Sequence, residues 1–138
     1  MFSKQTIRDI DLDGKTVLLR ADYNVPVADG KITDDYRIKQ SLPTVKYLLE
    51  HNVKLIICSH LGRPTGPKDS ANSLFPVAKR LQQLIDKPVE FVTDCVGESA
   101  TKAAKDLKQG QVLLLENLRF HEEEKANDDE FAKQLASL

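Results

Sequence analysis

The sequence predicts an α/β fold in which a parallel β-sheet carries helices on both faces, giving three layers. Two observations lead to this prediction. Four short runs rich in Val, Ile and Leu are typical of buried strands, and the segments between them repeat their apolar residues at helical spacing. Strands that alternate with helices of this length form βαβ units, whose right-handed crossovers place helices on both faces of the sheet.

The four predicted strands cover residues 16–19, 54–58, 89–92 and 111–115. Each is a nearly continuous apolar run, as expected for a strand that is buried on both faces. A different pattern occurs at residues 25–32, where Asp29 and Gly30 separate two short apolar pairs. Because an Asp-Gly pair favours a tight turn between strands, we expect a β-hairpin here, at the rim of the sheet.

Four predicted helices present apolar stripes at intervals of three or four residues. The stripes consist of Ile38, Leu42, Val45 and Leu49; of Val77, Leu81, Leu84 and Ile85; of Ala100, Ala103, Ala104 and Leu107; and of Phe131, Leu135 and Leu138. Pro43 lies inside the first stripe and is expected to bend or restart that helix. Ser73 is the predicted cap of the second helix, and Pro76 lies in its first turn. Gly110 follows the third helix, and the fourth begins near Asp128.

Length and charge bound the possible functions. A chain of 138 residues with 41% hydrophobic residues fits one domain, and we find no linker that would divide it. Twenty basic and 21 acidic residues give a net charge of -1, which argues against binding to nucleic acid or to an anionic membrane. The sequence has neither an apolar run of membrane-spanning length nor a signal-peptide core, so we expect a soluble, cytoplasmic protein.

The two cysteines are expected to be structural. Cys58 and Cys95 each lie in or next to an apolar run, where a reduced thiol behaves as a small hydrophobic group. The three histidines, His51, His60 and His121, are scattered along the chain. Since neither cysteine has a ligand partner at a spacing typical of zinc sites, the sequence predicts no metal site.

The positions of the arginines indicate an anion site. Arg20, Arg63 and Arg119 each follow a predicted strand, and ligands of open parallel sheets bind outside the carboxyl ends of the strands. Arg37 lies near the start of a helix, where a cation is unfavourable unless an anion is close by. The guanidinium fork matches phosphate and carboxylate groups. The four arginines therefore predict a site for a small ligand with several negative charges.

An alternative explanation stays open for each single arginine, because carboxylates lie close by in the sequence. In that case the arginines only form ion pairs with Asp22, Asp34, Asp35 and Glu116. Other phosphate-binding motifs do not fit. Residues 62–68 have the wrong spacing for a P-loop and contain two prolines, and no dinucleotide fingerprint follows the first strand. The acidic run at residues 122–124 is interpreted as a solvated face without a function.

Three segments carry a resemblance to a known family. They read R-A-D-Y-N-V-P at residues 20–26, S-H-L-G-R-P at 59–64 and L-E-N-L-R-F at 115–120. In order and spacing they resemble the N-terminal signatures of the phosphoglycerate kinases, and the resemblance covers essentially the whole chain. It implies a Rossmann-like sheet in which residues 1–138 form an incomplete N-terminal domain, the part that binds 3-phosphoglycerate. The nucleotide-binding C-terminal domain of the family would then be absent from this chain.

The resemblance also implies the residues of the site. Asp22 and Asn24 would contact the glycerate part of 3-phosphoglycerate, while Arg37 would lie nearest the reacting carboxylate and act as the catalytic residue. His60, Arg63 and Arg119 would hold the phosphate. The complete set of substrate-binding residues implied in this way is Arg20, Asp22, Tyr23, Asn24, Arg37, His60, Leu61, Gly62, Arg63 and Arg119.

The reaction implied by the family is the reversible transfer of a phosphoryl group from Mg-ATP to 3-phosphoglycerate, giving 1,3-bisphosphoglycerate and ADP in glycolysis. Magnesium and nucleotide would bind to the absent domain, so we expect no cofactor or metal in this chain and no activity of the chain alone. The intact enzyme is expected to be a monomer, whereas an exposed sheet edge in the fragment would favour self-association. Two alternatives stay open, which are a stand-alone, non-catalytic module that binds a small phosphorylated acid and a purely structural fragment.

Overall fold

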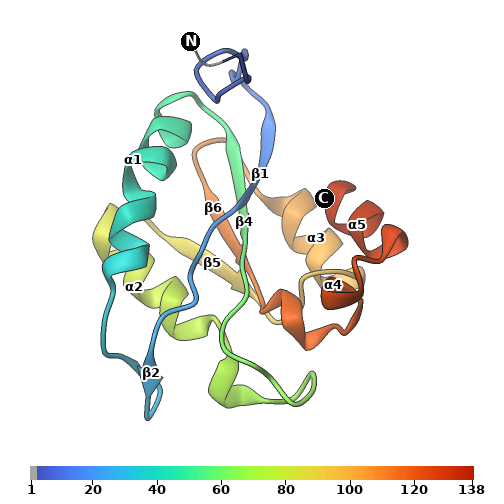
Figure 1. Ribbon diagram of the computed structural model, residues 1–138. Coiled ribbons are helices and arrows are strands. Elements are labelled where there is room, and N and C mark those ends of the chain that lie inside the picture. The colour runs from blue at the N-terminus through green and yellow to red at the C-terminus, as the bar shows by residue number, and fades with distance from the viewer. Residues whose placement is uncertain (1–2) are drawn as a thin grey trace.

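The apolar runs of the sequence form one parallel sheet in the structure, a computed structural model that describes residues 3–138 (Figure 1). Its four strands are Thr16–Arg20 (β1), Lys54–Cys58 (β4), Val89–Val92 (β5) and Val112–Leu115 (β6). They lie in the order β1-β4-β6-β5, and all three neighbouring pairs are parallel. The bounds of the four predicted strands are therefore confirmed to within one residue.

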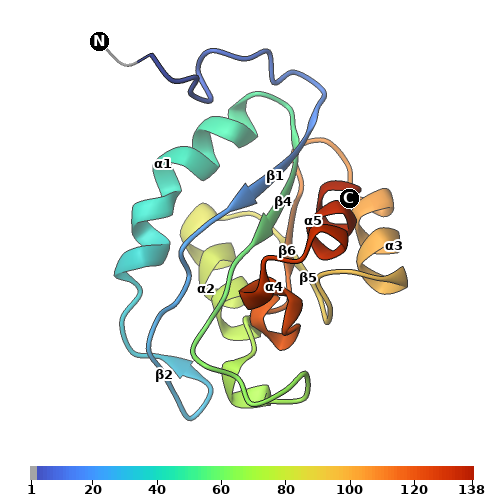
Figure 2. The same ribbon diagram turned by 45° about the vertical axis from the view of Figure 1, so that its right-hand side comes forward.

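Helices cover both faces of this sheet, as Figures 1 and 2 show. Two helices lie on one face, Tyr36–Glu50 (α1) and Phe75–Ile85 (α2). The other face carries Glu98–Asp106 (α3), the single turn Glu123–Ala126 (α4) and Asp129–Ala136 (α5). Two short 3₁₀ helices complete the structure, Ser70–Asn72 (η1) and Leu118–Phe120 (η2). The predicted three-layer α/β fold is confirmed.

The central strand β4 shows how the sequence builds two cores. Successive side chains of a strand point to opposite faces. Leu55 and Ile57 accordingly pack into the core beneath α1 and α2, while Ile56 and Cys58 pack into the core on the side of α3 and α5. The four buried positions of β4, Leu55 to Cys58, are therefore all apolar, and only Lys54 at its start is polar and partly exposed.

The predicted hairpin is also confirmed. Val27–Ala28 (β2) pairs antiparallel with Lys31–Ile32 (β3). Asp29 and Gly30 between them have φ angles of 51° and 72°, the left-handed conformation that a two-residue type I′ turn requires at both positions.

The helix prediction differs from the structure in two details, and one helix was not predicted. Of the two outcomes expected at Pro43, a restart of the helix does not occur, because α1 runs continuously from Tyr36 to Glu50. Buried stripe residues on both sides of Pro43 hold the helix against the sheet, and this packing outweighs one lost hydrogen bond.

Helix α2 has Leu74 rather than Ser73 at its N-cap, although Ser73 Oγ still accepts a hydrogen bond from Phe75 N at 3.2 Å. The single turn α4 was not predicted because it has no apolar stripe.

Within residues 3–138, the structure contains no helix with the length and apolarity that crossing a membrane requires.

Candidate anion-binding site

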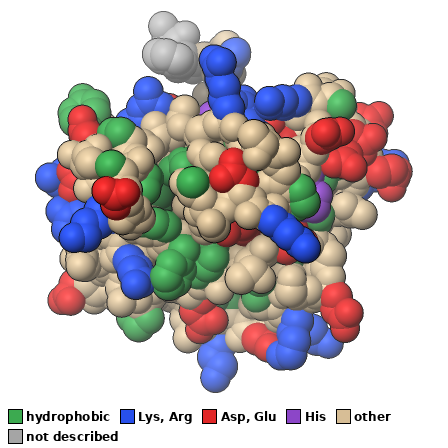
Figure 3. Space-filling view, turned by 90° about the horizontal axis from the view of Figure 1, so that it is seen from below, with side chains coloured by type: hydrophobic (Ala, Val, Ile, Leu, Met, Phe, Trp, Pro, Cys, Tyr) green, Lys and Arg blue, Asp and Glu red, His purple; other side chains and the backbone are tan. Residues whose placement is uncertain are grey.

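The segments that follow β1, β4 and β6 meet at the carboxyl edge of the sheet, the lower end in Figure 1 and the face seen in Figure 3. Hydrogen bonds join all three segments. Tyr23 N donates to Ser59 Oγ at 2.9 Å, Leu118 N donates to Ser59 O at 3.0 Å, and Gly62 N donates to Asn24 Oδ1 at 2.8 Å. The segments that carry the predicted arginines therefore form one connected surface.

Two of the arginines converge on a single carboxylate. Arg20 Nη2 donates to Glu124 Oε1 at 2.9 Å, and Arg119 Nε donates to Glu124 Oε2 at 3.0 Å. The Glu124 side chain is only 10% exposed. Burial alone would raise the pKa of Glu124, but the hydrogen bonds from the two arginines outweigh this effect and lower it. Arg20 and Arg119 thus hold an anionic oxygen pair at the place where the sequence predicts anion binding.

Glu124 corrects the sequence-based interpretation of the acidic run. Glu122 and Glu123 are exposed, as expected for a solvated face. Glu124 instead points from α4 to Arg20 and Arg119, so the interpretation is wrong for this residue. Charge alone cannot distinguish three successive glutamates, because the direction of each side chain depends on where the single turn α4 lies.

Arg37 forms an ion pair with a second carboxylate of the site. Its Nη1 donates to both oxygens of Asp22, at 2.9 and 3.0 Å. Arg37 is the second residue of α1, and the first turn of that helix also carries Lys39. Two cations thus lie at the positive end of the helix dipole, an arrangement that a bound anion would stabilise.

The ion pairs test the alternative explanation from the sequence, in which the arginines only form ion pairs with nearby carboxylates. Arg20, Arg37 and Arg119 do contact acids, although of the four acids proposed from the sequence only Asp22 is involved. Arg63 is exposed on the loop after β4 and forms no ion pair with any residue in the range 3–138. Three of the four predicted arginines contact two carboxylates and Arg63 contacts neither, so the four arginines exceed these two carboxylates by two positive charges.

His60 lies among these charges. Burial is the main effect that lowers its pKa, followed by the charge of Arg119, with a smaller contribution from Arg20. Asp22 and Glu124 act in the opposite direction. The imidazole is consequently neutral at pH 7, and it can accept or donate a hydrogen bond without adding to the repulsion between the arginines.

A titration of His60 checks this arrangement. In the ligand-free chain, NMR should place its pKa below the unperturbed value of about 6.5. Because the folded state then binds protons less readily than the unfolded state, His60 contributes a loss of stability as the pH falls below about 6.5. Arg119→Gln should raise the pKa, whereas the control Arg80→Gln should leave it unchanged, since Arg80 is not among the charges that act on His60. An equal pKa in the wild type and in Arg119→Gln would contradict the arrangement.

Asn117 fixes the loop that carries His60 and Arg63. Its side chain is fully buried and makes four hydrogen bonds to the backbone. Oδ1 accepts from Leu61 N at 3.3 Å and from Arg119 N at 3.0 Å, while Nδ2 donates to Leu61 O and Asn72 O, both at 2.8 Å. One amide thus connects the residues after β4 with the residues after β6.

Glu116 anchors the far end of the same loop. This buried carboxylate accepts hydrogen bonds from Leu74 N at 2.8 Å and from Ser73 Oγ at 2.6 Å, at the start of α2. A negative charge at this position also suits the helix dipole. The sequence analysis considered Glu116 only as a possible partner of an arginine, but its hydrogen bonds instead hold the loop in place.

Gly62 is required for the shape of the loop. Its φ angle of 62° lies in the left-handed region, and a Cβ atom at this position would come within 2.0 Å of Asn72 Oδ1. A side chain at residue 62 would therefore cost backbone strain and would also displace Asn72.

Two residues of the predicted set have buried side chains. Tyr23 is fully buried and its hydroxyl hydrogen-bonds Ser41 Oγ at 2.9 Å, while Leu61 is 3% exposed. Burial raises the pKa of the Tyr23 hydroxyl. Both residues are therefore buried as a whole, and they shape the site from below through the hydrogen bonds of Tyr23 N to Ser59 Oγ and of Leu61 N to Asn117 Oδ1.

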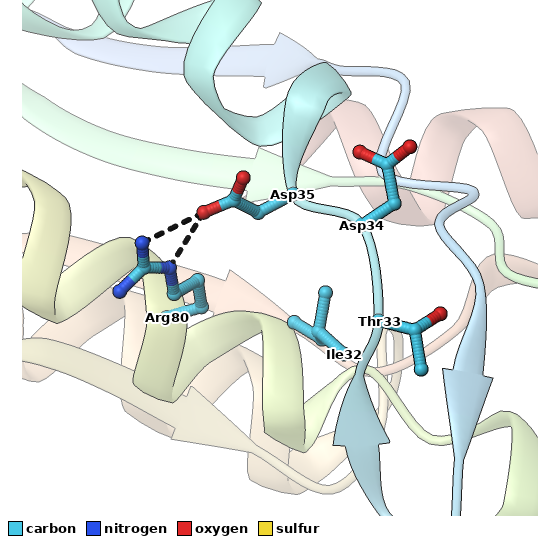
Figure 4. Close-up of a pocket in the computed structure, with 5 residues that line it drawn as sticks. All are labelled: Ile32, Thr33, Asp34, Asp35 and Arg80. Atoms are coloured by element: carbon cyan, nitrogen blue, oxygen red, sulfur yellow. Dashed lines mark hydrogen bonds and ion pairs between the residues drawn. The ribbon is translucent and has the colours of Figure 1, made fainter.

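Two hollows lie near the carboxyl edge. One, of about 740 Å3, runs between residues 64–67 and residues 119–126 and is lined by Arg119. The other, of about 520 Å3, is shown in Figure 4, where Arg80 reaches Asp35 at 2.7 Å. Since Arg80 is already paired and the lining also includes Asp34, the second hollow does not suit an anion.

The chain is similar to known proteins over nearly its whole length. The sequence profile of a family described as "Phosphoglycerate kinase" matches residues 7–138. The phosphoglycerate kinase of Dictyoglomus turgidum is 55% identical over 139 residues, an alignment that covers 99% of this chain and 35% of that protein. The phosphoglycerate kinase of Aquifex aeolicus is also 55% identical over 139 residues, covering 100% of this chain and 35% of its own length.

Solved structures show the same likeness. The crystal structure of phosphoglycerate kinase from Pyrococcus horikoshii superimposes with a TM-score of 0.85 at 37% identity, covering 95% of this chain and 34% of the other. The structure of phosphoglycerate kinase from Coxiella burnetii gives a TM-score of 0.79 at 36% identity and covers 96% of this chain. The chain spans about a third of the length of the relatives that it matches.

Proposed function

Because the chain belongs to the phosphoglycerate kinase family, we propose that it forms the 3-phosphoglycerate-binding part of an enzyme that transfers a phosphoryl group between ATP and 3-phosphoglycerate. The convergence of Arg20 and Arg119 on the Glu124 carboxylate is the observation that best supports this function. Two guanidinium groups that hold one carboxylate have the geometry for a phosphate oxygen pair as well.

The charge of the site suits this ligand. A phosphate monoester carries about -1.5 to -2 charges at pH 7, and 3-phosphoglycerate adds a carboxylate. The excess of two positive charges in the ligand-free site would be neutralised by such an anion. Arg119 binds Glu124 through Nε alone, and its two Nη groups have no hydrogen-bond partner within the described chain. These groups, together with Arg63, remain available for the phosphate.

The other residues of the predicted set receive distinct roles in this proposal. Asn24 uses Oδ1 to hold Gly62 N, which leaves its Nδ2 to donate to the glycerate. The exposed Asp22 carboxylate would accept a hydrogen bond from the hydroxyl of the ligand. Tyr23, Leu61 and Gly62 would contribute by fixing the shape of the loops through their backbone hydrogen bonds, and His60 through a neutral imidazole.

The chemistry requires little more than positioning and charge neutralisation. The carboxylate of 3-phosphoglycerate is already ionised at neutral pH and can attack the γ-phosphorus of ATP without a general base. Arg37 would stabilise the negative charge on the transferring group and orient the attacking carboxylate. In phosphoryl transfer Mg2+ supplies the charge that bridges the phosphates. Asp22 and Glu124, the two carboxylates of the site, are both engaged by arginines, so we place the magnesium and the nucleotide outside this chain.

Binding to the 138-residue chain tests the proposal. With 3-phosphoglycerate at ten times its Kd, the free energy of unfolding should rise by about 1.4 kcal/mol, and Tm by roughly 3–6 °C. Arg119→Ala should abolish the shift. Arg8→Ala is the matched control, because Arg8 precedes β1 and lies over the Tyr47 ring, with 5.5 Å between Arg8 Cζ and the ring centroid. Failure of 3-phosphoglycerate to raise Tm would contradict the proposal.

A stand-alone binding module would give the same thermal shift, so a second observation is needed to distinguish it from a kinase. An open reading frame that continues past codon 138 into a nucleotide-binding domain would support the kinase. A chain that binds the acid and whose gene ends at codon 138 would support the module.

A further inference from the structure

A second cluster of polar side chains lies at the carboxyl edge of the sheet, separate from the arginines. Asp94 and Cys95 follow β5, and His121 follows η2 after β6. One ligand atom from each residue, a carboxylate oxygen, the sulfur and a ring nitrogen, lies within 4.8 Å of the other two. We propose that Asp94, Cys95 and His121 bind a thiophilic divalent cation of the Zn2+ type, with the remaining coordination position open to water.

The types of ligand atom determine which cation fits. A thiolate, an imidazole and a carboxylate are the three groups that bind Zn2+ in proteins. Mg2+ and Ca2+ prefer sites made of oxygen atoms alone, so they would not use Cys95 or His121. Three protein ligands with one open position form the coordination typical of zinc sites that are accessible to solvent.

The distances require only a small adjustment. His121 Nε2 and Asp94 Oδ1 are now 2.7 Å apart, joined by a hydrogen bond. In a tetrahedral zinc site the nitrogen and oxygen ligands lie about 3.3 Å apart, and sulfur lies about 3.5 Å from each of them. The cation would thus take the place of the proton between them, and the neutral ring would carry its proton on Nδ1 instead. The nitrogen and oxygen would separate by about 0.6 Å, and the sulfur would approach by on the order of 1 Å.

Neighbouring groups already orient two of the ligands. Asp94 Oδ1 accepts hydrogen bonds from the backbone N–H of Cys95 at 2.7 Å and of Val96 at 3.4 Å. The imidazole of His121 lies against the Phe131 ring, with 5.3 Å between the ring centroids. Such supporting contacts are typical of metal ligands, because they fix the direction of each ligand atom before the metal binds.

The exposure of the three residues provides a route for the cation. The side chains of Asp94 and His121 are 43% and 28% exposed, whereas Cys95 is fully buried beneath them. A cation from solvent therefore meets the carboxylate and the imidazole first and the sulfur last. His121 also lines the hollow of about 740 Å3, which opens this side of the cluster to water.

The thiol of Cys95 must lose its proton when a cation binds. Burial, and after it the negative charge of Asp94, raise the pKa of Cys95 to about 12. At neutral pH the sulfur is a protonated thiol, which is a poor nucleophile. Binding of the cation forms the sulfur–metal bond and releases the thiol proton to solvent. The Asp94 charge that disfavours a free thiolate attracts the cation.

Co2+ is the probe for the test, because its thiolate complexes absorb in the near ultraviolet. We expect the chain to bind one Co2+ with a sulfur-to-cobalt charge-transfer band, and Zn2+ to displace it, since zinc binds the same ligands more tightly. Cys95→Ala should eliminate the band. His121→Gln and Asp94→Asn should each weaken binding by about tenfold or more. Cys58→Ala is the matched control, since Cys58 is the other buried free thiol, and it should keep the band.

A second measurement does not depend on the folding of any variant. In the wild-type chain, addition of Zn2+ should shift the NMR signal of the ring nitrogen of His121 that now bonds Asp94, at one equivalent of metal. If this signal stays unchanged, or if the cobalt band persists in Cys95→Ala, the three residues are only an ion pair above a core thiol and the proposal fails.

Discussion

Replacing Arg37 with alanine, in an enzyme that contains this segment together with its nucleotide domain, is expected to lower kcat by about 10²–10³-fold. KM for 3-phosphoglycerate should change by less than about tenfold, because we expect Arg37 to act mainly on charge that develops in the transition state. Arg37 lies at the start of α1 and binds both oxygens of Asp22, whereas Arg20 and Arg119 share a different carboxylate, that of Glu124. Steady-state kinetics that give kcat and KM for the wild type and for Arg37→Ala measure this difference directly.

Two further variants make the result specific. Arg37→Lys keeps the charge but loses the planar fork, so it should recover only part of the lost kcat. Arg8 precedes β1 and lies over the Tyr47 ring, so Arg8→Ala should leave kcat unchanged. A kcat for Arg37→Ala that equals the wild-type value would remove Arg37 from the mechanism.

The second large effect concerns stability. Asn117→Ala is expected to lower the free energy of unfolding by about 3–5 kcal/mol. The substitution removes four hydrogen bonds and leaves backbone groups of Leu61, Asn72 and Arg119 without their partner, and each buried group left unpaired costs about 1–3 kcal/mol. Urea unfolding measures the loss. The variant should also lose the thermal shift with 3-phosphoglycerate, since the loop that carries His60 and Arg63 would no longer be fixed.

Two further substitutions test whether the buried hydrogen bonds of Asn117 cause the loss of stability. Asn117→Asp keeps the acceptor oxygen but turns a buried carboxylate oxygen toward the carbonyl groups of Leu61 and Asn72, so it should destabilise the fold at least as much as Asn117→Ala. Gln109→Ala removes an exposed amide and should change stability by less than about 0.5 kcal/mol. A loss below about 1 kcal/mol for Asn117→Ala would show that the loop is held by other contacts.

Much of the fold could be predicted from the sequence because strands and helices have different apolar periods. The apolar residues of β4 and the Asp29-Gly30 turn each determine local structure by themselves, and both are as predicted. The convergence of Arg20 and Arg119 also followed from one general property, that the ends of parallel strands share an edge.

What could not be predicted depends on contacts between segments. Asn117 looks like any polar residue after a strand, and its four bonds exist only because the loop after β4 passes over it. The proximity of Cys95 to His121 depends on strand order, which places β5 beside β6, and sequence spacing does not reveal this order. Glu124 belongs to a run of three acids, and only the placement of α4 brings it to the arginines.

The carboxylate shared by Arg20 and Arg119 has a consequence for ionic strength. An arginine cluster without a counter-ion of its own condenses anions from solution, and a ligand must displace them, so its affinity falls steeply as salt is added. Here Glu124 is a tethered counter-ion whose local concentration does not vary with the buffer. Because Glu124 already neutralises part of the cluster, binding of the ligand phosphate beside it releases fewer solution anions, and the plot of log Kd against log salt concentration should therefore have a shallow slope.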